Sequence, residues 1–511
     1  MLAIECPTKL YYTGKSEEYS NQKDQNEFLM ALAEGGFQVG ELAKYYNPCC
    51  SQMPQCGHNI KSIDYKESID ETKKYLNDEK VILYEPAICF EDFLIRIDVF
   101  IKNKNKIEII EVKAKSFDLD KDHFRNKKGK GLYIDSEWRK YLYDIAFQTW
   151  IVKKTFPDYE IEPYLMLVNK NCRATVDGLN QLFRIRQNKD QRKYVEIMKE
   201  ITPELLGDEV LIRLPVKEYV EMIINGDDID PLKKKSEDLK EFSQRINDYA
   251  HYYKNDIKYP INTGLHCKNC EFKNSPDNTS NLLKSGFEEC WKKKFGESYN
   301  FNEPHIFELW DYRRTEQMIS NGIHFLKDFK YEDLFSKEPK PAKIGLNRIE
   351  RQWLQINKRT KDNSNGEYIS PQLFEEMNKW IFPLHFIDFE TSMVAIPFNK
   401  GRKPYEQIAF QFSSHKVHEN GDVEHFEWIS NNNSFPNFEF VLNLKQILDN
   451  DKGSIFKYSN HENTVLRQIH KQISTEKNEI GIFSDNGITN DEMLNWIDTI
   501  TNWDYINSKG K

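Results

Sequence analysis

The segment FLIRIDVFIKNKNKIEIIEVKAKS, residues 93–116, decides the fold expected for the first half of the chain. Apolar residues stand at every second position around Asp98, which predicts a strand with one apolar face. The polar residues 103–106 predict a turn, and after it Glu111 and Lys113 alternate with apolar residues again. The segment therefore predicts a β-hairpin with one buried face and one polar face. Its expected apolar positions are Phe93, Ile95, Ile97, Val99, Ile101, Ile110, Val112 and Ala114.

The alternation brings Asp98, Glu111 and Lys113 to the polar side of this hairpin. Two carboxylates can bind Mg²⁺ or Mn²⁺ through hard oxygen ligands. A neighbouring lysine can orient an attacking water and offset the charge that develops on a phosphate. An Asp followed by Glu-x-Lys is thus the set that metal-dependent phosphodiester hydrolysis requires, although each residue alone also suits an exposed strand face.

The bulk composition of the 511 residues predicts an ordinary globular chain of two or three domains. Asp and Glu total 81 against 72 Lys and Arg, and the net charge of -9 excludes a globally basic nucleic-acid binder. Binding to a polyanion would depend on local patches. One candidate is Lys121–Lys130, KDHFRNKKGK, which also suits a solvated loop.

The sequence favours a cytoplasmic location. It contains no apolar run of membrane-spanning length, and its first residues lack the apolar region of a signal peptide. Disulfides are rare inside cells, so we expect the nine cysteines to be free thiols or metal ligands.

Strands and helices alternate around the hairpin, and this order predicts an α/β domain with a mixed sheet. Glu41 falls on the first expected helix, Glu85 on a strand just before the hairpin, and Gln148 on a later helix. Residues 175–260 are charged and look mainly helical. The other expected elements are helices over 26–46, 69–77 and 136–156, and strands over 81–90 and 163–168.

The cysteines form two groups. Cys267 and Cys270 make a CxxC that fits zinc, a redox pair or an iron–sulfur cluster, and Cys290 follows them. Cys6 could supply the fourth ligand from the far end of the domain, and closing so long a loop would stabilise the fold. The other group suits a reduced surface loop better than a zinc site, because its spacing matches no known site; it consists of Cys49, Cys50, Cys56 and His58.

A second α/β domain is expected over residues 381–511, after a helical linker over 296–380. Asp388 and Glu390 alternate with apolar residues, so both carboxylates lie on one face of a strand. Glu462 opens a helix that follows another short strand. Residues 408–417 and 425–429 are expected to extend the sheet.

The order of these motifs resembles the RecB-type branch of the PD-(D/E)XK nucleases over about residues 1–295. By this resemblance Asp98 and Glu111 would bind the metal with the Val112 carbonyl, and Lys113 would position water. Gln148 would belong to the helical motif that follows the catalytic strand, and Glu41 would serve from the first helix. The cysteine set resembles the 4Fe-4S ligands of the CRISPR-associated and AddB-like members; it consists of Cys6, Cys267, Cys270 and Cys290.

The chain departs from the family pattern at a few positions. Many relatives carry a histidine where this chain has Gly40, and the tyrosine that follows the helical glutamine is Val152 here. The last two cysteines of the cluster set are also unusually far apart. These departures bear on metal stoichiometry and cluster type, with zinc as the alternative, more than on the reaction class.

The second domain resembles the DnaQ-like, DEDD-type 3′–5′ exonucleases of the ribonuclease H fold. Asp388 and Glu390 match the first motif and Glu462 the second. The family needs two more acids, the last of them in a pattern with His or Tyr. Asp498 and Asp504 follow Glu462 but lack this pattern. We therefore expect an incomplete exonuclease domain whose open sheet edge could take a protein partner. The pairing of the two domains resembles a family of bacterial proteins with two nuclease types.

The resemblances imply a metal-dependent DNA nuclease, an exonuclease on single-stranded or end-containing DNA that acts in DNA repair or in defence against foreign DNA. Two alternatives stay open. One is a non-catalytic nucleic-acid-binding scaffold with a structural zinc. The other is an RNA-processing 3′–5′ exonuclease driven by the second domain.

Overall fold

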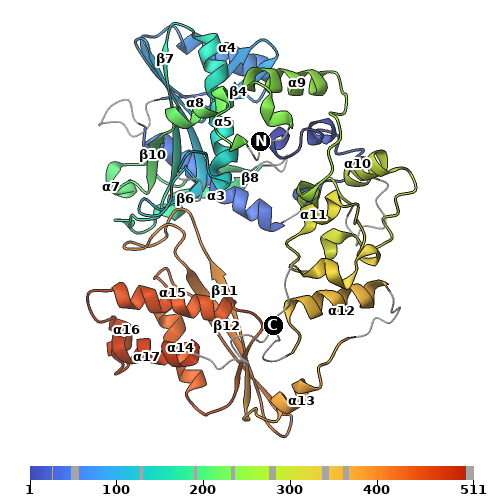
Figure 1. Ribbon diagram of the computed structural model, residues 1–511. Coiled ribbons are helices and arrows are strands. Elements are labelled where there is room, and N and C mark those ends of the chain that lie inside the picture. The colour runs from blue at the N-terminus through green and yellow to red at the C-terminus, as the bar shows by residue number, and fades with distance from the viewer. Residues whose placement is uncertain are drawn as a thin grey trace.

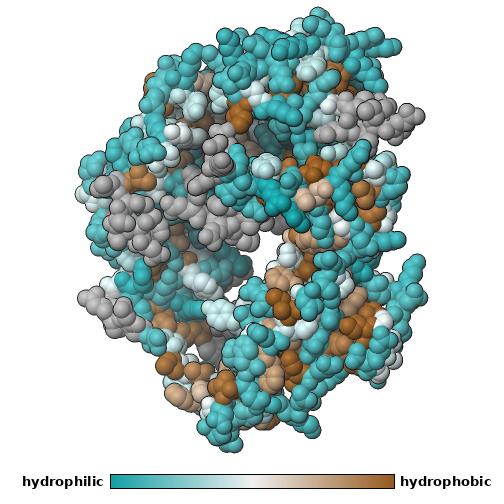
Figure 2. Space-filling model, turned by 180° about the vertical axis from the view of Figure 1, so that it is seen from behind, coloured by the Kyte–Doolittle hydropathy of each residue, from teal (hydrophilic) through white to brown (hydrophobic). Residues whose placement is uncertain are grey.

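The computed structural model describes residues 1–25, 27–47, 57–126, 131–188, 193–231, 236–274, 283–335, 345–360 and 367–501. An N-terminal lobe and a C-terminal lobe are joined on one side by a column that contains α10, α11 and α12 (Figure 1). The space-filling view shows an opening between the lobes and this column (Figure 2). Both lobes combine helices with a mixed sheet, which confirms the predicted α/β class.

The sheet of the N-terminal lobe has the strand order β1-β2-β5-β6-β7-β10. β6 is antiparallel to β5 and parallel to β7, so the predicted mixed sheet is confirmed. β5 and β6 join through a tight turn in which Lys104 adopts a φ of 54°. The strands span His58–Asn59 (β1), Lys80–Tyr84 (β2), Val99–Asn103 (β5), Lys106–Phe117 (β6), Glu160–Asn169 (β7) and Leu211–Pro215 (β10).

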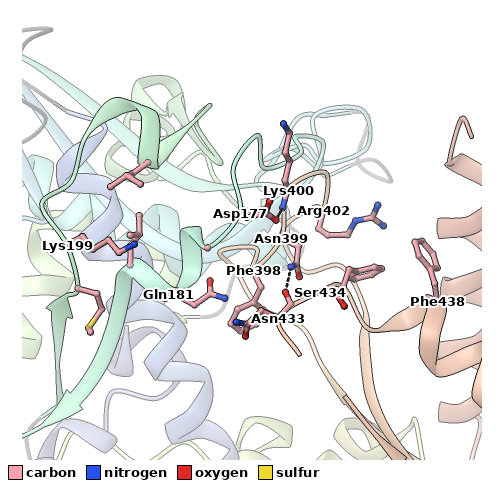
Figure 3. Close-up of a pocket in the computed structure, with 15 residues that line it drawn as sticks. Asp177, Gln181, Lys199, Phe398, Asn399, Lys400, Arg402, Asn433, Ser434 and Phe438 are labelled. Carbon is pink, nitrogen blue, oxygen red and sulfur yellow. Dashed lines mark hydrogen bonds between the residues drawn. The ribbon is translucent and has the colours of Figure 1, made fainter. Parts of the chain in front are cut away.

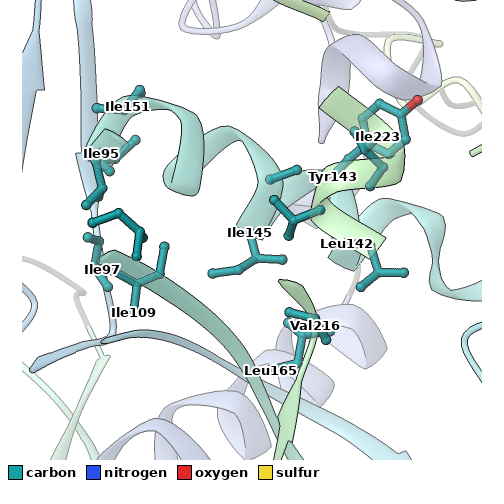
Figure 4. Packing of buried hydrophobic residues seen from close by; sticks show 14 of the residues in the cluster. Ile95, Ile97, Ile109, Leu142, Tyr143, Ile145, Ile151, Leu165, Val216 and Ile223 are labelled. Carbon is teal, nitrogen blue, oxygen red and sulfur yellow. The ribbon is translucent and has the colours of Figure 1, made fainter. Parts of the chain in front are cut away.

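Helices cover both faces of this sheet. α3 (Glu27–Tyr45) packs Val39 and Leu42 against Ile110 and Val112 of β6. α5 (Ser136–Thr155) packs on the opposite face, where Leu142, Ile145 and Ile151 meet Ile97, Ile109 and Leu165 (Figure 4). Because both faces are buried, the central strands carry apolar residues on both sides. The remaining helices of this lobe are Leu2–Glu5 (α1), Lys9–Tyr12 (α2), Tyr65–Tyr75 (α4), Leu179–Leu182 (α6), Pro203–Leu206 (α7), Lys217–Asn225 (α8) and Phe242–Lys254 (α9).

The prediction of one continuous strand before the turn is wrong. β4 (Phe93–Arg96) pairs with β3 (Ala87–Phe90) in a separate hairpin, and the chain bends at Asp98 before β5 begins. The Asp98 side chain accepts a hydrogen bond from the Val112 N–H at 2.6 Å. The Asp98 side chain thus occupies the Val112 N–H, a backbone donor of β6, at the point where β5 begins.

The predicted strand over 81–90 is likewise divided into β2 and β3. Glu85 adopts a φ of 57° between them, directly before Pro86. A positive φ is uncommon outside glycine and ends the extended conformation. The two breaks face each other, because the Glu85 N–H donates to the Asp98 carbonyl at 3.2 Å.

The expectation that residues 175–260 are mainly helical is only partly right. The region contains β8 (Phe183–Gln187) and β9 (Lys193–Ile197), which form a two-stranded sheet, as well as β10. Arg184 and Arg186 stand exposed on alternate positions of β8. Both strands carry charged side chains, and for this reason the sequence of residues 175–260 looks like that of exposed helices.

The column packs around its own hydrophobic cluster. Trp291 of α10 (Gly286–Phe295) is fully buried and shares this cluster with Ile306, Leu326 and Ile356. The predicted domain boundary at residue 295 therefore lies inside one cluster. Its other helices are α11 (Thr315–Ser320) and α12 (Arg348–Thr360), with 3₁₀ turns at Leu265–Asn269, Ile306–Glu308, Leu326–Asp328 and Tyr331–Leu334. Helix α13 (Gln372–Met377) follows α12 in the chain, before β11 begins.

In the ranges that the structure describes, no helix combines the length and the apolar character that crossing a membrane would require.

The sheet of the C-terminal lobe has the order β13-β12-β11-β14, with β14 parallel to β11 and the other pairs antiparallel. Burial alternates along β11, so Ile387 and Phe389 are buried while Asp388 and Glu390 are exposed, and the prediction that both carboxylates share one face of a strand is confirmed. The strands span Leu384–Ser392 (β11), Ile408–Val417 (β12), Val423–Ile429 (β13) and Ile455–Lys457 (β14). The helices span Asn437–Leu448 (α14), His461–Thr475 (α15), Gly481–Ser484 (α16) and Asn490–Thr501 (α17).

A loop of the C-terminal lobe enters the N-terminal lobe. Ala395 and Ile396 are buried in the same cluster as Ile110 and Val112. Backbone hydrogen bonds fix the loop, among them Gly178 N–H to the Phe398 carbonyl at 2.8 Å and Gly401 N–H to the Ala174 carbonyl at 2.7 Å. The two lobes are therefore in direct contact close to the central strand β6.

Candidate functional site

Polar side chains meet on the face of β6 that α5 covers. The Lys113 ammonium forms an ion pair with Glu111 and a second one, at 2.9 Å, with Asp144 of α5. Gln148, one helical turn further along α5, donates a hydrogen bond to Glu111 at 2.6 Å. The Gln148 carbonyl oxygen is buried and has no hydrogen-bond partner among the described residues. Strand β6 and helix α5 thus hold Glu111 between a lysine and an amide.

Asp98 joins this group from the bend before β5. Its carboxylate accepts the Val112 N–H, and it interacts electrostatically with Glu111 and Lys113. The structure therefore brings Asp98, Glu111, Lys113 and Gln148 together, from three separate elements. Val112 contacts Asp98 through its backbone N–H and not through its carbonyl.

Glu41 lies at the edge of the group. It forms an ion pair with Lys44 of the same helix at 2.7 Å, and its charge acts on Glu85. Glu85 also interacts with Glu111, and it is the charged group with the largest effect on Asp98. Glu85 therefore connects Glu41 electrostatically to Asp98 and Glu111.

Burial and mutual repulsion change the protonation of the two central acids. Desolvation, followed by the charge of Glu85, raises the pKa of Asp98 to about 7. Desolvation, followed by the charge of Asp98, raises the pKa of Glu111 to about 8. The neighbouring carboxylates raise the pKa of Lys113 despite its burial, so this ammonium keeps its proton.

The acids fit a divalent cation by their chemistry. Asp98 and Glu111 are oxygen donors whose ionised forms are disfavoured without a counter-charge, and a hard cation would supply it. The unpartnered Gln148 oxygen adds a neutral acceptor beside them. Over the residues that are described, no group of three or more His, Cys, Asp or Glu side chains is arranged to hold a metal ion unaided. Backbone, amide or water oxygens would have to complete the coordination.

The sequence motifs do not indicate two members of the group, Asp144 and Glu85. Asp144 lies four residues before Gln148 on α5, and this spacing places both side chains on one helix face. Glu85 stands at the break between β2 and β3. Helical spacing back from Gln148 would have indicated Asp144, whereas Glu85 depends on the positive φ that turns the chain toward Asp98.

Cys6, Cys267, Cys270 and Cys290 line one small cavity of about 20 Å³. Their side chains interact electrostatically, and burial raises the pKa of Cys267 to about 12 and that of Cys290 to about 11. The hydroxyl of Tyr12 lies 3.4 Å from the Cys290 sulfur. The four thiols share this cavity, but as placed among the described residues they do not form a group that could hold a metal ion. Thiolates are the ligands that a soft metal or an iron–sulfur cluster binds, and either would displace their protons.

The N-terminal segment is held against the cysteine segment by other contacts as well. Lys9 forms an ion pair with Glu271 at 2.6 Å, and the Ser20 N–H donates to the Lys284 carbonyl at 3.0 Å. Tyr12 and Phe272 share a small aromatic cluster next to Cys270. The two ends of the N-terminal half are therefore joined at the cavity, as the sequence predicts for a clip formed by Cys6.

The remaining sequence candidates either make other contacts or fall outside the described residues. Cys49, Cys50 and Cys56 fall outside the described residues, and His58 stacks on Tyr75 with ring centroids 4.0 Å apart. In the basic patch Lys121–Lys130, Lys121 pairs with Asp118 at 3.1 Å, and residues 127–130 are outside the described ranges.

The acids of the C-terminal lobe are only partly assembled. Asp388 and Glu390 are exposed on β11, whereas Glu462 of α15 is buried and one of its oxygens has no hydrogen-bond partner among the described residues. Thr391 lies 3.2 Å from the ring of His461, which places the start of α15 beside the end of β11. Asp498 pairs with His470 at 3.4 Å, and Asp504 is outside the described residues.

One comparison with known proteins gives a match. A family model described as "Domain of unknown function (DUF2779)" matches residues 385–504, which covers the C-terminal lobe. No curated protein and no solved structure matches the chain.

Proposed function

We propose that the chain is a divalent-metal-dependent nuclease whose N-terminal lobe hydrolyses phosphodiester bonds in DNA and has a RecB-type PD-(D/E)XK fold. The observation that carries the proposal is the meeting of Asp98 and Glu111 with Lys113 and Gln148. A half-buried and a buried carboxylate with raised pKa values, a protonated lysine and an amide are brought together from a bend, a central strand and a covering helix. Perturbed acids grouped in this way are typical of catalytic sites.

In this proposal Asp98 and Glu111 hold Mg²⁺ or Mn²⁺, which would activate a water and offset negative charge on the phosphate. Gln148 keeps Glu111 in place through its hydrogen bond. Lys113 stays charged and can stabilise the phosphate or orient the water. Asp144 fixes the lysine from α5 and is a positioning residue, since its contact is with Lys113.

We further propose that the four cysteines bind a 4Fe-4S cluster that clips the N-terminus to the column, with zinc as the alternative. The support is the shared cavity and the soft character of the donors. For the C-terminal lobe we propose a DnaQ-like fold with an incomplete site. The exposed pair on β11, with the adjacent start of α15, supports a vestige of such a site rather than a complete one.

The experiment is a cleavage assay on end-labelled single-stranded DNA, double-stranded DNA and RNA, with Mg²⁺ or Mn²⁺ and with EDTA. The variants are Asp98→Asn and Glu111→Gln, which keep the side-chain shape and remove the charge. Asp158→Asn, an exposed acid in the turn after α5, is the matched control.

We expect metal-dependent cleavage of DNA that falls at least about 100-fold in both site variants and stays unchanged in the control. If a chain that retains its cluster cleaves none of the substrates, the result would favour the alternative of a non-catalytic nucleic-acid-binding scaffold. Cleavage of RNA that survives Asp98→Asn would instead assign the activity to the C-terminal lobe.

A further inference from the structure

A cavity between the two lobes is lined by neither the acids nor the cysteines of the candidate sites. It measures about 770 Å³, which is within the range of small-molecule and cofactor sites. Side chains from both lobes line it: Asp177, Gln181 and Lys199 are among those of the N-terminal lobe, and the C-terminal lobe contributes residues from the loops after β11 and β13 and from α14 (Figure 3).

The lining combines aromatic rings with basic groups. Phe398, Phe435 and Phe438 are partly buried and line the cavity from the C-terminal lobe. Lys199 and Lys400 are exposed at its wall, one from each lobe. Rings on which a base can stack, next to ammonium groups that can contact phosphate, are the features that bind single-stranded nucleic acid without sequence preference.

Arg402 is built into the same wall. Its guanidinium stacks on Phe435, 4.4 Å from the ring centroid, and pairs with Glu476 at 2.6 Å. Its Nη1 is buried without a hydrogen-bond acceptor in the described part of the chain, and the nearest Glu406 oxygen is 3.7 Å away. Arg402 therefore holds Phe435 in the wall, next to the two exposed lysines.

The wall is also fixed by the contact between the lobes. Asp177 accepts the backbone N–H of Lys400 at 2.9 Å, and Asn399 donates to the Asn433 carbonyl at 2.8 Å. The same loop continues to Tyr405, which contacts Ala114, the residue after Lys113. A strand held in the cavity would thus lie on the loop that supports the candidate catalytic strand.

We propose that this interlobe cavity binds a nucleotide segment of single-stranded nucleic acid, with phosphates at Lys199 and Lys400 and a base against Phe398. The identity of the ligand rests on the proposed function. The cavity acts as a holding site for the strand, separate from the acids that would cleave it.

The test measures binding of a fluorescein-labelled thymidine oligonucleotide of about 12 nucleotides, a length within known site sizes. Fluorescence anisotropy is recorded in EDTA over a series of salt concentrations, with the full chain carrying Asp98→Asn. Three variants are compared in this background: the pair Lys199→Glu and Lys400→Glu, the single change Phe398→Ala, and a control pair. The control is Lys66→Glu with Lys73→Glu on α4, two exposed lysines with the same change in net charge.

We expect the cavity pair to weaken binding by at least about 10-fold at low salt, and to reduce the slope of log K against log salt by about 1 to 2. Phe398→Ala should weaken binding about 5-fold or more without changing that slope, because stacking releases no counterions. The control pair should leave both quantities near the parent values. Circular dichroism and the melting temperature confirm that each variant is folded.

Equal losses in the cavity pair and the control pair would overturn the inference, even if the chain proves to be a nuclease. So would binding of ATP or inorganic phosphate that the oligonucleotide does not displace. Conversely, a loss confined to the cavity variants in a chain that cleaves nothing would keep the inference and overturn the proposed catalysis. A uridine oligonucleotide run in parallel identifies whether the strand is DNA or RNA.

Discussion

The hydroxyl of Tyr405 in the C-terminal lobe donates a hydrogen bond to the backbone carbonyl of Ala114 in the N-terminal lobe. Ala114 directly follows Lys113 and lies where the pairing of β6 with β7 is interrupted, between Lys113 and Ser116. Tyr405 itself adopts a φ of 54°, and its N–H is held by the Val394 carbonyl at 2.8 Å. The C-terminal lobe therefore supports the strand that carries Glu111 and Lys113.

Removing this hydroxyl should lower nuclease activity without unfolding the chain. A buried hydrogen bond contributes about 1 kcal/mol, so we expect Tyr405→Phe to reduce kcat by about 5-fold, with KM little changed. Tyr65→Phe, at an exposed position on α4, is the control. A fall in the melting temperature with kcat intact would show that the contact only joins the lobes.

The two candidate acid sites should differ sharply in their importance. We expect Asp98→Ala to remove DNA cleavage and Asp388→Ala to leave it almost unchanged, because Asp388 is exposed on β11 whereas Asp98 contacts the strand that carries Glu111 and Lys113. Both variants are assayed side by side on the same labelled strand. A large loss in Asp388→Ala, with Asp98→Ala active, would reverse the ranking of the two lobes.

The stability of the metal-free chain should depend on pH in a defined direction. Because the pKa values of Asp98 and Glu111 are raised to about 7 and 8, the native metal-free chain binds more protons than the unfolded chain above about pH 4. Its free energy of unfolding should fall as the pH rises through this window, by up to about 1.4 kcal/mol per pH unit for each group.

The measurement is the melting temperature of the wild type and of Asp98→Asn in EDTA between pH 4 and pH 8. The wild type should lose stability relative to the variant as the pH rises. Added Mg²⁺ should raise the melting temperature of the wild type more at pH 8 than at pH 6, since protons compete with the metal. A shift of the same size in Asp98→Asn would contradict the assignment.

The cysteine cavity should hold iron. We expect anaerobically purified protein to contain about four iron atoms per chain and to lose them, with a lower melting temperature, on Cys267→Ser or Cys6→Ser. Exposed Cys89→Ser is the matched control. Elemental analysis that finds one zinc and no iron, from iron-replete cells, would replace the cluster with a structural zinc.

His305 should make the column sensitive to acid. Burial, followed by repulsion from His324 and Lys273, lowers its pKa to about 3. Its ring nitrogens contact the Tyr299 hydroxyl at 3.2 Å and the Phe307 N–H at 3.3 Å, so the native ring is neutral. Below about pH 6.5 the unfolded chain binds the extra proton, so the stability should fall as the pH falls from 6.5 toward 3, by about 1.4 kcal/mol per unit.

Thermal unfolding of the wild type and of His305→Gln at pH 7, 6 and 5 checks this. The difference between the two should shrink as the pH falls, because the variant lacks the titrating group. His251→Gln, at an exposed histidine on α9, should follow the wild type at every pH. A constant difference across the range would mean that His305 stays neutral in both states.

Local periodicity was enough to predict several of the elements that carry the candidate sites. The alternation around Asp388 and Glu390 correctly predicted a strand with both carboxylates on one face, and the helical spacing after Ser136 predicted α5 with Gln148. These features depend on the 2.0 and 3.6 residue periods, which each segment carries in its own sequence. The same reasoning placed Ile110 and Val112 on the opposite side of β6 from Glu111.

Only the tertiary structure decided how these elements combine. Alternation predicted a continuous strand through Asp98, but the contacts of Asp98 with Val112 and Glu85 turn the chain there. Asp144 becomes a partner of Lys113 because α5 crosses β6, and Tyr405 reaches Ala114 from a loop almost 300 residues later (separation 291). Such contacts join residues far apart in sequence, and their energies depend on burial and charge that arise only when the sheet, the helices and the two lobes pack together.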